Sequence, residues 1–268
     1  MGIFLSLIER RDLVWQFFSR NVKSRHRGSF LGPIWLLVNP LLMLCLYVFA
    51  FGVVFGGRLT DSTEESTLDY ALGVLIGLNI IGFISGVISS TPSSILSYPN
   101  FVRKVVFPLE VLPVAQTGSL LYDMLIGFGL SLLGVVFLGP GLLVTCLWIP
   151  ILLFPILMIG LGLALLLSSL SIYIRDFGQI SSFLCLSILY SSGVFYSAEK
   201  ASMVAPSIWN FLQWNPLLQI IDSLREIILW GREPSWWWVS YSWAVAVGVL
   251  TMGTFVFQKL RPSFGDLI

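Results

Sequence analysis

The stretch LLVTCLWIPILLFPILMIGLGLALLLSSLSI, residues 142–172, decides the fold because it runs without a charged side chain. A helix that crosses a bilayer needs about 20 mostly apolar residues, so this stretch is long enough to span one. Pro150 and Pro155 lie inside it, but prolines are tolerated in membrane helices where neighbouring groups satisfy the freed carbonyls. The whole chain of 268 residues is also rich in apolar residues, with 56% hydrophobic and 11% charged residues. Soluble domains carry about 25% charged residues. The sequence therefore predicts a membrane protein.

Further apolar runs are separated by short charged clusters, and together they predict an all-α polytopic fold with six transmembrane helices. The predicted spans are 31–55, 70–90, 114–138, 142–172, 177–196 and 236–257. Residues 198–235 hold two helical pieces that are each too short to span, so we interpret them as re-entrant or interfacial helices. We predict a single domain, which consists of an interfacial segment (1–30), the six-helix membrane part (31–257) and a cytoplasmic tail (258–268).

The distribution of basic residues predicts the orientation of the chain. With six spans both termini lie on the same side, and that side carries eleven of the 15 Lys and Arg residues. Cytoplasmic loops carry an excess of Lys and Arg, so we expect both termini in the cytoplasm. The net charge of +1 leaves no basic field, so we expect no nucleic-acid partner.

Residues 12–25 predict an amphipathic helix that lies in the membrane interface. Val14, Trp15, Phe18 and Val22 share one face of this helix, and polar side chains face the other way. A basic cluster follows at headgroup level, and two interpretations of it stay open: binding to anionic lipids, or binding the phosphates of a lipid-linked substrate. The candidate phosphate contacts are Lys23, Arg25 and Arg27.

The chain lacks the motifs of several enzyme classes. It contains no Gly-Lys pair, so the phosphate-binding loop of an ATPase is absent. His26 is the only histidine, which argues against a His-based metal site or catalytic dyad. We therefore expect no catalytic residue, no metal ligand and no cofactor on this chain. Asp123 is the only ionisable residue well inside a span, and either a hydrogen bond between helices or a role in gating or subunit contact would explain it.

The N-terminal motifs resemble a known family. Residues 20–35 read RNVKSRHRGSFLGPIW, and Asn39-Pro40 follows inside the first span. This order resembles permease subunits of polysaccharide ABC exporters, most closely the O-antigen Wzm-type family, with capsule and teichoic-acid exporter permeases as relatives. Residues 194–196 and 214–217 follow the order of that family as well, whereas His26 departs from it because an aromatic residue is usual there.

The resemblance implies partners and a location. It implies a homodimer of this chain in the bacterial inner (cytoplasmic) membrane, in contact with membrane lipids. It also implies two copies of a separate ABC ATPase subunit, which would bind ATP and Mg, and a polyprenyl-pyrophosphate-linked polysaccharide as the cargo. Residues 1–268 would then form one transmembrane permease domain.

The loop between the second and third spans is a candidate docking element. Residues 101–107 can form a short amphipathic helix that prolines isolate on both sides, which suits docking into the cleft of a partner. An ordinary interfacial turn is the alternative for this loop, and a capped helix end is the alternative for the charge pair after the fourth span. In the resembled family both segments face the ATPase. The implied coupling residues are Asn100, Phe101, Val102, Arg103, Lys104, Val105, Phe107, Pro108, Arg175 and Asp176.

Aromatic side chains offer candidates for a glycan path, because flat rings contact the C–H faces of sugars. Helix packing is the alternative, and periodicity does not separate the two. The candidate channel-lining residues are Trp35, Tyr47, Phe51, Tyr190, Phe195 and Tyr196, and the candidate outer gate residues are Trp209, Trp214 and Arg225. Two other functions also stay open: a membrane-embedded lipid- or glycan-modifying enzyme, and an ATP-independent channel.

Overall fold

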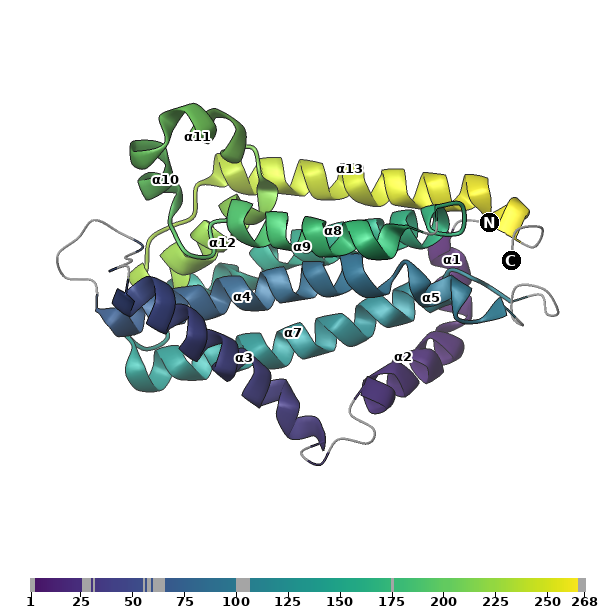
Figure 1. The fold of residues 1–268 in the computed structure, drawn as a ribbon, viewed down its shortest axis with the longest axis horizontal. Helices are drawn as coiled ribbons and strands as arrows, with labels where there is room; N and C mark the ends of the chain where they lie inside the picture. The colour runs from purple at the N-terminus through teal and green to yellow at the C-terminus, as the bar shows by residue number, and fades with distance from the viewer. Residues whose placement is uncertain are drawn as a thin grey trace.

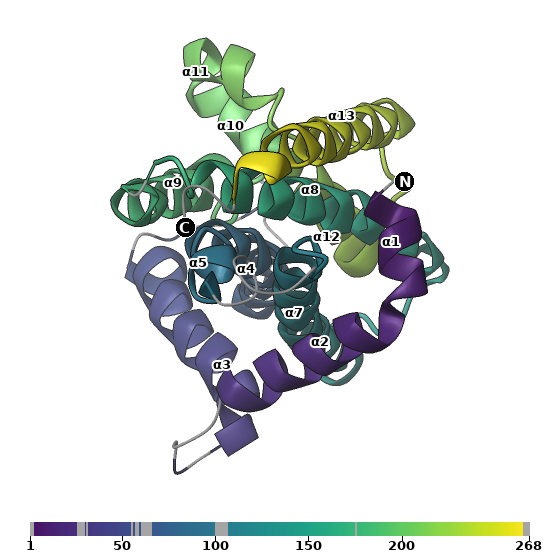
Figure 2. The same ribbon diagram turned by 90° about the vertical axis from the view of Figure 1, so that its right-hand side faces the viewer.

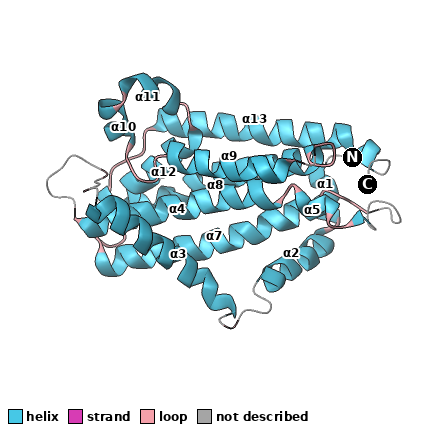
Figure 3. Cartoon of the chain, in the orientation of Figure 1, coloured by secondary structure: helices cyan, strands magenta, loops and turns pink. Residues whose placement is uncertain are grey.

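The computed structural model describes residues 3–25, 30, 32–54, 56, 59, 66–99, 107–174 and 176–264. Within these ranges the chain forms helices that are joined by turns, and it forms no strand (Figure 3). The predicted all-α fold is therefore confirmed. The two termini lie at the same end of an elongated helical bundle (Figure 1).

Five helical stretches are long and apolar enough to cross a membrane, and each coincides with a predicted span. The stretches are Trp35–Val54 (α3, Trp35–Tyr47, extended by a π-helical segment, Val48–Val54), α4 (Thr67–Ser90), α7 (Val111–Leu138), Val144–Leu170 (a 3-10 turn, Val144–Trp148, and α8, Ile149–Leu170) and Trp236–Ser263 (α13, Trp236–Leu260, and a 3-10 turn, Arg261–Ser263). As expected for membrane helices, Pro40 and Pro155 lie inside α3 and α8.

The predicted fifth span, 177–196, is shorter as a helix. It contains α9 (Phe177–Ser191), which has 15 residues and is therefore about 22 Å long. The chain turns directly after this helix, where Gly193 adopts a φ of 67°, a conformation that glycine accepts at little cost. The hydrocarbon core is about 30 Å thick, so the count of six spans stays a prediction.

The helix α4 forms the centre of the bundle, with α3, α7, α8 and α9 around it (Figure 2). Its most apolar window is 67% buried, whereas the equivalent window of α3 is 0% buried. On the far side of α8, α13 packs in very close contact at two glycines. A Cβ atom on Gly253 would clash with the backbone of Gly162, and a Cβ atom on Gly162 would clash with the backbone of Val249.

Local sequence explains where the helices begin. Ser66 caps α4 in a reciprocal capping box with Asp69, which satisfies free backbone N–H groups at the start of the helix. Asn215 is the N-cap of the helix that begins at Pro216, and its side chain accepts a hydrogen bond from the backbone N–H of Leu217 at 3.0 Å. Proline at the first helical position needs no N–H partner and fixes a helical φ.

The region between α9 and α13 consists of short helices, as predicted. They are α10 (Ala198–Val204), α11 (Pro206–Leu212), α12 (Pro216–Arg225) and a π-helical segment, Glu226–Trp230. The helices α10 and α11 project from the bundle at the end opposite the termini (Figures 1 and 2), whereas α12 contacts α4, α8 and α13.

The N-terminal segment contains α1 (Ile3–Glu9) and α2 (Arg11–Arg25), so the predicted helix over 12–25 is present. It packs along α7, where Phe18 of the predicted apolar face contacts Tyr122. Phe17 is the buried side chain of α2, whereas Trp15 is 66% exposed. Phe17 joins a second hydrophobic cluster near the termini, which also contains Leu109, Val111, Phe257 and Phe264.

Candidate functional site

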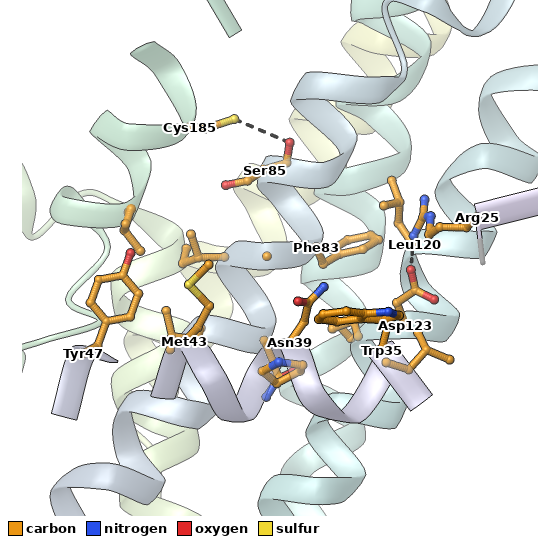
Figure 4. Close-up of a pocket in the computed structure, with 18 of the residues that line it drawn as sticks. Arg25, Trp35, Asn39, Met43, Tyr47, Phe83, Ser85, Leu120, Asp123 and Cys185 are labelled. Carbon is orange, nitrogen blue, oxygen red and sulfur yellow. Dashed lines mark hydrogen bonds and ion pairs between the residues drawn. The ribbon is translucent and has the colours of Figure 1, made fainter. Parts of the chain in front are cut away.

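A cavity of about 790 Å³ lies between α3 and the helices α4, α7 and α9 (Figure 4). Most of its lining side chains are apolar, and a few polar groups stand among them. The polar lining residues are Arg25, Asn39, Asn79, Ser85, Asp123 and Ser182. Because α3 forms one wall of the cavity and is itself little buried, an outward movement of α3 would widen the cavity.

An ion pair between Arg25 and Asp123 lies at one end of the cavity, beside the ring of Trp35 (Figure 4). Arg25 is the last residue of α2, and its guanidinium Nη1 donates to Oδ2 of Asp123, which lies well inside α7. The two side chains are 31% and 24% exposed, and desolvation lowers the pKa of the Arg25 guanidinium. The structure thus brings together a predicted phosphate contact and the one carboxylate that the sequence placed inside a span.

Aromatic rings pack together beyond the other end of α3. The rings of Phe51 and Phe195 stack with centroids 4.5 Å apart, Tyr47 lies 4.9 Å from Phe195, and Tyr190 lies 6.0 Å from it. The hydroxyl of Tyr196 donates to the carbonyl of Tyr190 at 2.7 Å.

This aromatic cluster contains most of the predicted channel-lining residues. Trp35 and Tyr47 line the cavity, whereas the other predicted residues pack beyond it. Tyr47 belongs to both groups, at the opposite end of the cavity from Asp123 (Figure 4). The helix α3 and its π-helical extension therefore contact the bundle through Tyr47 and Phe51 near one end, and Trp35 lines the cavity near the other.

Asn79 is a polar contact of the cavity that the sequence analysis missed. Its Nδ2 donates to the carbonyl of Leu75 at 2.8 Å and to the hydroxyl of Ser131 at 3.1 Å, which joins α4 to α7. The opposing residue is Gly127, where a Cβ atom would clash with the Asn79 amide. The signal in the sequence is an amide inside an apolar span, because such groups are placed where another helix satisfies them.

Arg225, a predicted outer gate residue, is fully buried. Its guanidinium donates to the carbonyls of Gly73 at 3.0 Å, Gly193 at 2.7 Å, Val194 at 2.5 Å and Tyr196 at 3.2 Å. These contacts join α12 to α4 and to the turn after α9. Among the residues that the structure describes, Arg225 is therefore enclosed and faces no open path.

The two predicted gate tryptophans lie at the surface of this end of the bundle. Trp214 follows α11 and is 50% exposed, and its ring contacts Trp238 and Tyr241 edge-on. Trp209 is half-buried within α11.

Two carboxyl groups near Arg225 have raised pKa values, and both lie outside the five long apolar helices. Burial, together with the neighbouring charge of Asp222, raises the pKa of Glu226 to about 7. Burial also raises the pKa of Asp222 itself, although Arg225 and the backbone N–H of Ala198 oppose this shift. Asp222 and Glu226 are four residues apart in one helical segment, whereas Glu199 of α10 approaches them only in the fold.

The candidate coupling loop is described only at its edges. Residues 100–106 and Arg175 lie outside the described residues, and so does Arg27 of the candidate phosphate site. Lys23 is exposed on α2, Pro108 is buried, and Asp176 precedes α9 without a side-chain cap.

The edges of this loop contact the amphipathic helix α2. The ring of Phe107 lies 5.5 Å from that of Phe17. The guanidinium of Arg20 lies over the rings of Phe17 and Tyr98, at 4.2 and 4.8 Å from their centroids, and donates to the Tyr98 hydroxyl at 2.8 Å.

Glu110 is a second polar residue that the sequence analysis did not select. It lies directly before α7, is fully buried, and accepts a hydrogen bond from the hydroxyl of Ser6 in α1 at 2.6 Å. Its other oxygen forms an ion pair with Arg261 at 3.4 Å. One carboxylate thus joins the start of the chain, the end of the coupling loop and the end of α13.

Comparison with known proteins places these features in a family. Residues 12–229 match the family described as ABC-2 type transporter. The chain is 23% identical over 260 residues to the O-antigen export system permease protein RfbA of Klebsiella pneumoniae, covering 96% of this chain and 95% of that protein. It is 26% identical over 273 residues to the protein of the same name from Myxococcus xanthus, covering 98% and 97%. The chain is a multi-pass membrane protein that belongs to the ABC-2 type transporter family.

Proposed function

We propose that this chain is the transmembrane subunit of an ATP-binding-cassette exporter that moves lipid-linked polysaccharide from the cytoplasm to the periplasm. The cavity under α3 carries the proposal, because it has an arginine at one end, an aromatic cluster beyond the other and an apolar wall between them. This arrangement of a cation, an apolar wall and aromatic rings suits a cargo with a charged phosphate group, a lipid chain and sugar rings. The names of the two relatives, which match nearly the full chain, support the same cargo class.

In this proposal Lys23, Arg25 and Arg27 bind the pyrophosphate of the polyprenyl-pyrophosphate-linked cargo. Arginine suits this task, because its planar guanidinium binds phosphate oxygens in a bidentate manner. The aromatic rings of Tyr47, Phe51 and Phe195 then offer flat surfaces for the sugars on the far side.

The proposed assembly contains two copies of this chain and two copies of a separate ATPase subunit. ATP and Mg are bound by the ATPase, and the loop that contains residues 100–108 docks onto it together with Asp176. The exposed apolar side chains of α3 and α9, such as Leu41, Leu46 and Phe183, support coverage by a second copy or by lipid. The location is the bacterial inner membrane with both termini in the cytoplasm, which the excess of basic residues at that end supports.

The decisive experiment is transport by the reconstituted complex. The chain is co-expressed with a candidate ABC ATPase subunit from the same organism, purified as a complex and placed in proteoliposomes with lipid-linked polysaccharide. We expect the ATPase to co-purify and the polysaccharide to become accessible to an external glycosidase only when ATP is hydrolysed. The matched control is an ATPase variant that binds ATP without hydrolysing it.

Three results would contradict the proposal. The first is that no ATPase co-purifies with the chain, and the second is that transport proceeds without ATP. The third is that the chain alone chemically modifies the lipid-linked polysaccharide. The second result would favour a channel, and the third would favour a membrane-embedded enzyme.

A further inference from the structure

The helix α3 lies at the edge of the bundle, where it contacts α4 and α7, and its most apolar window is 0% buried. Its far end is held by the ring contacts of Tyr47 and Phe51 with Phe195. Its near end follows α2 after a short connection, and α2 ends at the ion pair of Arg25 with Asp123. The cavity lies between these two points (Figure 4). Breaking the ion pair therefore removes a contact that holds the end of α2, which precedes α3 in the chain, against α7.

The ion pair is built in a way that allows exchange. Both side chains are partly exposed, at 31% and 24%, and both line the cavity. Partly exposed ion pairs contribute little to stability. A guanidinium has five N–H donors, so a diphosphate with several charged oxygens is a stronger partner for Arg25 than one carboxylate.

When a diphosphate replaces Asp123 as the partner of Arg25, the freed Asp123 carboxylate would cause a structural change. A diphosphate bound to Arg25 would lie next to Asp123, and two anions at this distance repel each other when they are partly desolvated. The repulsion is relieved if the end of α2 moves away from α7. The first part of α2 stays in place, because Phe17 is buried in the cluster near the termini and Phe18 contacts Gly118 and Tyr122 of α7. The movement is therefore confined to the end of α2 and the start of α3.

We propose that Arg25 and Asp123 form a latch that an isoprenoid diphosphate opens. The diphosphate takes Arg25 from Asp123, and the release of the end of α2 then lets α3 move outward, which widens the cavity for the lipid chain. This inference rests on the proposed function, since it assumes a diphosphate-bearing cargo. It adds a role for Asp123 as a competitor that keeps Arg25 occupied and the cavity narrow until the cargo arrives.

The first test measures binding to the permease–ATPase complex in phosphatidylcholine nanodiscs, with geranylgeranyl diphosphate as the probe. Arg25→Ala removes the binding partner, so we expect about tenfold weaker binding, which corresponds to about 1.4 kcal/mol. Asp123→Asn removes the competitor, so we expect binding about three- to tenfold tighter than in the wild type. Asp123→Glu keeps the negative charge and is the matched control, with an affinity near that of the wild type. Lys259→Gln removes a cation elsewhere and should leave the affinity unchanged.

The second test measures opening through the native thiol of Cys185, which lines the cavity from α9. We expect the diphosphate to increase its labelling by a membrane-permeant maleimide several-fold in a Cys146→Ser background. The exposed Cys45 of α3 serves as the internal reference. Arg25→Ala and Asp123→Asn should both raise Cys185 labelling without the probe, and the Arg25 variant should lose the further response to it.

The pattern across the two tests separates a latch from a purely structural ion pair. A latch predicts opposite effects of the two variants on affinity and the same effect on labelling. If both variants weaken binding, or if Asp123→Asn binds like Asp123→Glu, the latch is wrong. Inorganic pyrophosphate and phosphatidylglycerol nanodiscs form the comparison arms, and equal opening by either would show that the latch responds to a free anion or a lipid headgroup instead.

The latch and the proposed function fail in different ways. If wild-type complex transports lipid-linked polysaccharide but the two variants lack the predicted pattern, only the latch is overturned. If the wild-type complex neither binds the isoprenoid diphosphate nor transports the polysaccharide, the proposed function is overturned together with it.

Discussion

At the scale of single residues, Arg225 shows how a charged side chain is accommodated away from solvent. Its guanidinium is fully buried and is surrounded by backbone carbonyls from α4 and from the turn after α9. The glycines at positions 73 and 77 leave the space that it occupies, because a Cβ atom on Gly77 would lie 3.2 Å from its Nη2. The guanidinium thus holds a turn and two helices together at one point.

We predict that Arg225→Met destabilises the protein strongly. The substitution leaves several buried carbonyls without a donor, and each unsatisfied group costs about 1–3 kcal/mol. Thermal unfolding in detergent, followed by fluorescence-detected size-exclusion chromatography, should show a markedly lower midpoint or no folded peak. Arg232→Met removes an exposed cation close by and is the control. A midpoint like that of the wild type would show that these hydrogen bonds do not hold α12 in place.

The pKa of Glu226 predicts a dependence of stability on pH. Burial raises this pKa to about 7 from its ordinary value of 4.5, so the folded protein binds the proton more tightly than the unfolded chain does. The stabilisation is complete below pH 4.5 and is lost as the pH rises through about 7. Since the carboxyl group is only partly buried, we expect a loss of about 1 kcal/mol rather than the full shift.

Unfolding midpoints measured between pH 5 and pH 8 test this expectation, with buffers of constant ionic strength. The midpoint should fall as the pH rises, and Glu226→Gln should flatten the curve. A residual slope is expected from Asp222, whose pKa is raised in the same direction. A midpoint that rises over this range would contradict the expected sign.

At the scale of elements, the sequence predicts what depends on local composition. The five long apolar helices and α2 follow directly from apolar runs and helical periodicity. The end of α9 at Ser191 was not predicted, because apolar residues continue to Tyr196 while the chain already turns. That turn is stabilised by Arg225, which lies 32 residues from Gly193 in the chain. Composition alone carries no signal for such a distant contact.

In the candidate site, too, the sequence predicts the kinds of residues present but not which helix faces meet. The basic cluster after α2 and the aromatic residues of α3 were visible in the sequence. The pairing of Arg25 with Asp123 was not, because it depends on how α2 crosses α7. The burial of Phe17 was not predicted either, since a helix between lipid and protein has two apolar directions and Phe17 takes the one toward the protein.

The packing of α8 on α13 predicts a sharp difference between two glycines of the same helix. A Cβ atom on Gly253 would clash with the backbone of Gly162, whereas a Cβ atom on Gly248 would meet nothing within 4 Å. Overpacking costs about 1–3 kcal/mol, so Gly253→Ala should lower the unfolding midpoint. Gly248→Ala should be neutral or slightly stabilising, because alanine is the better helix former. Equal midpoints for the two variants would mean that α8 and α13 do not pack this closely.

At the scale of the whole molecule, the end that carries both termini is the one that we predict to face the cytoplasm and to receive force from an ATPase. The loop over residues 100–106 is flanked by Tyr98 and Phe107, which contact Phe17 and Arg20 of α2. On the other side of this loop, Glu110 contacts α1 and the end of α13. A push on the loop would therefore move α2 and both ends of the chain together.

Glu110→Gln tests whether this connection couples the loop to the rest of the molecule. Glutamine keeps the size of the side chain and can still accept the hydrogen bond from Ser6, but it loses the ion pair with Arg261. We expect the reconstituted complex to hydrolyse ATP while the amount of polysaccharide transported per ATP falls several-fold, because the loop then moves without the ends of the chain.

The reverse change, Arg261→Gln, leaves the buried carboxylate of Glu110 without its ion-pair partner. Removal of one partner of a buried ion pair costs about 3–5 kcal/mol. The cost here is smaller, because the Arg261 side chain is 43% exposed. The double variant removes both charges and should recover the stability that Arg261→Gln loses, but not the transport per ATP. If the double variant restores transport as well, Glu110 contributes stability alone and the connection between the loop and the two ends of the chain lies elsewhere, in the contacts of Phe107 with Phe17.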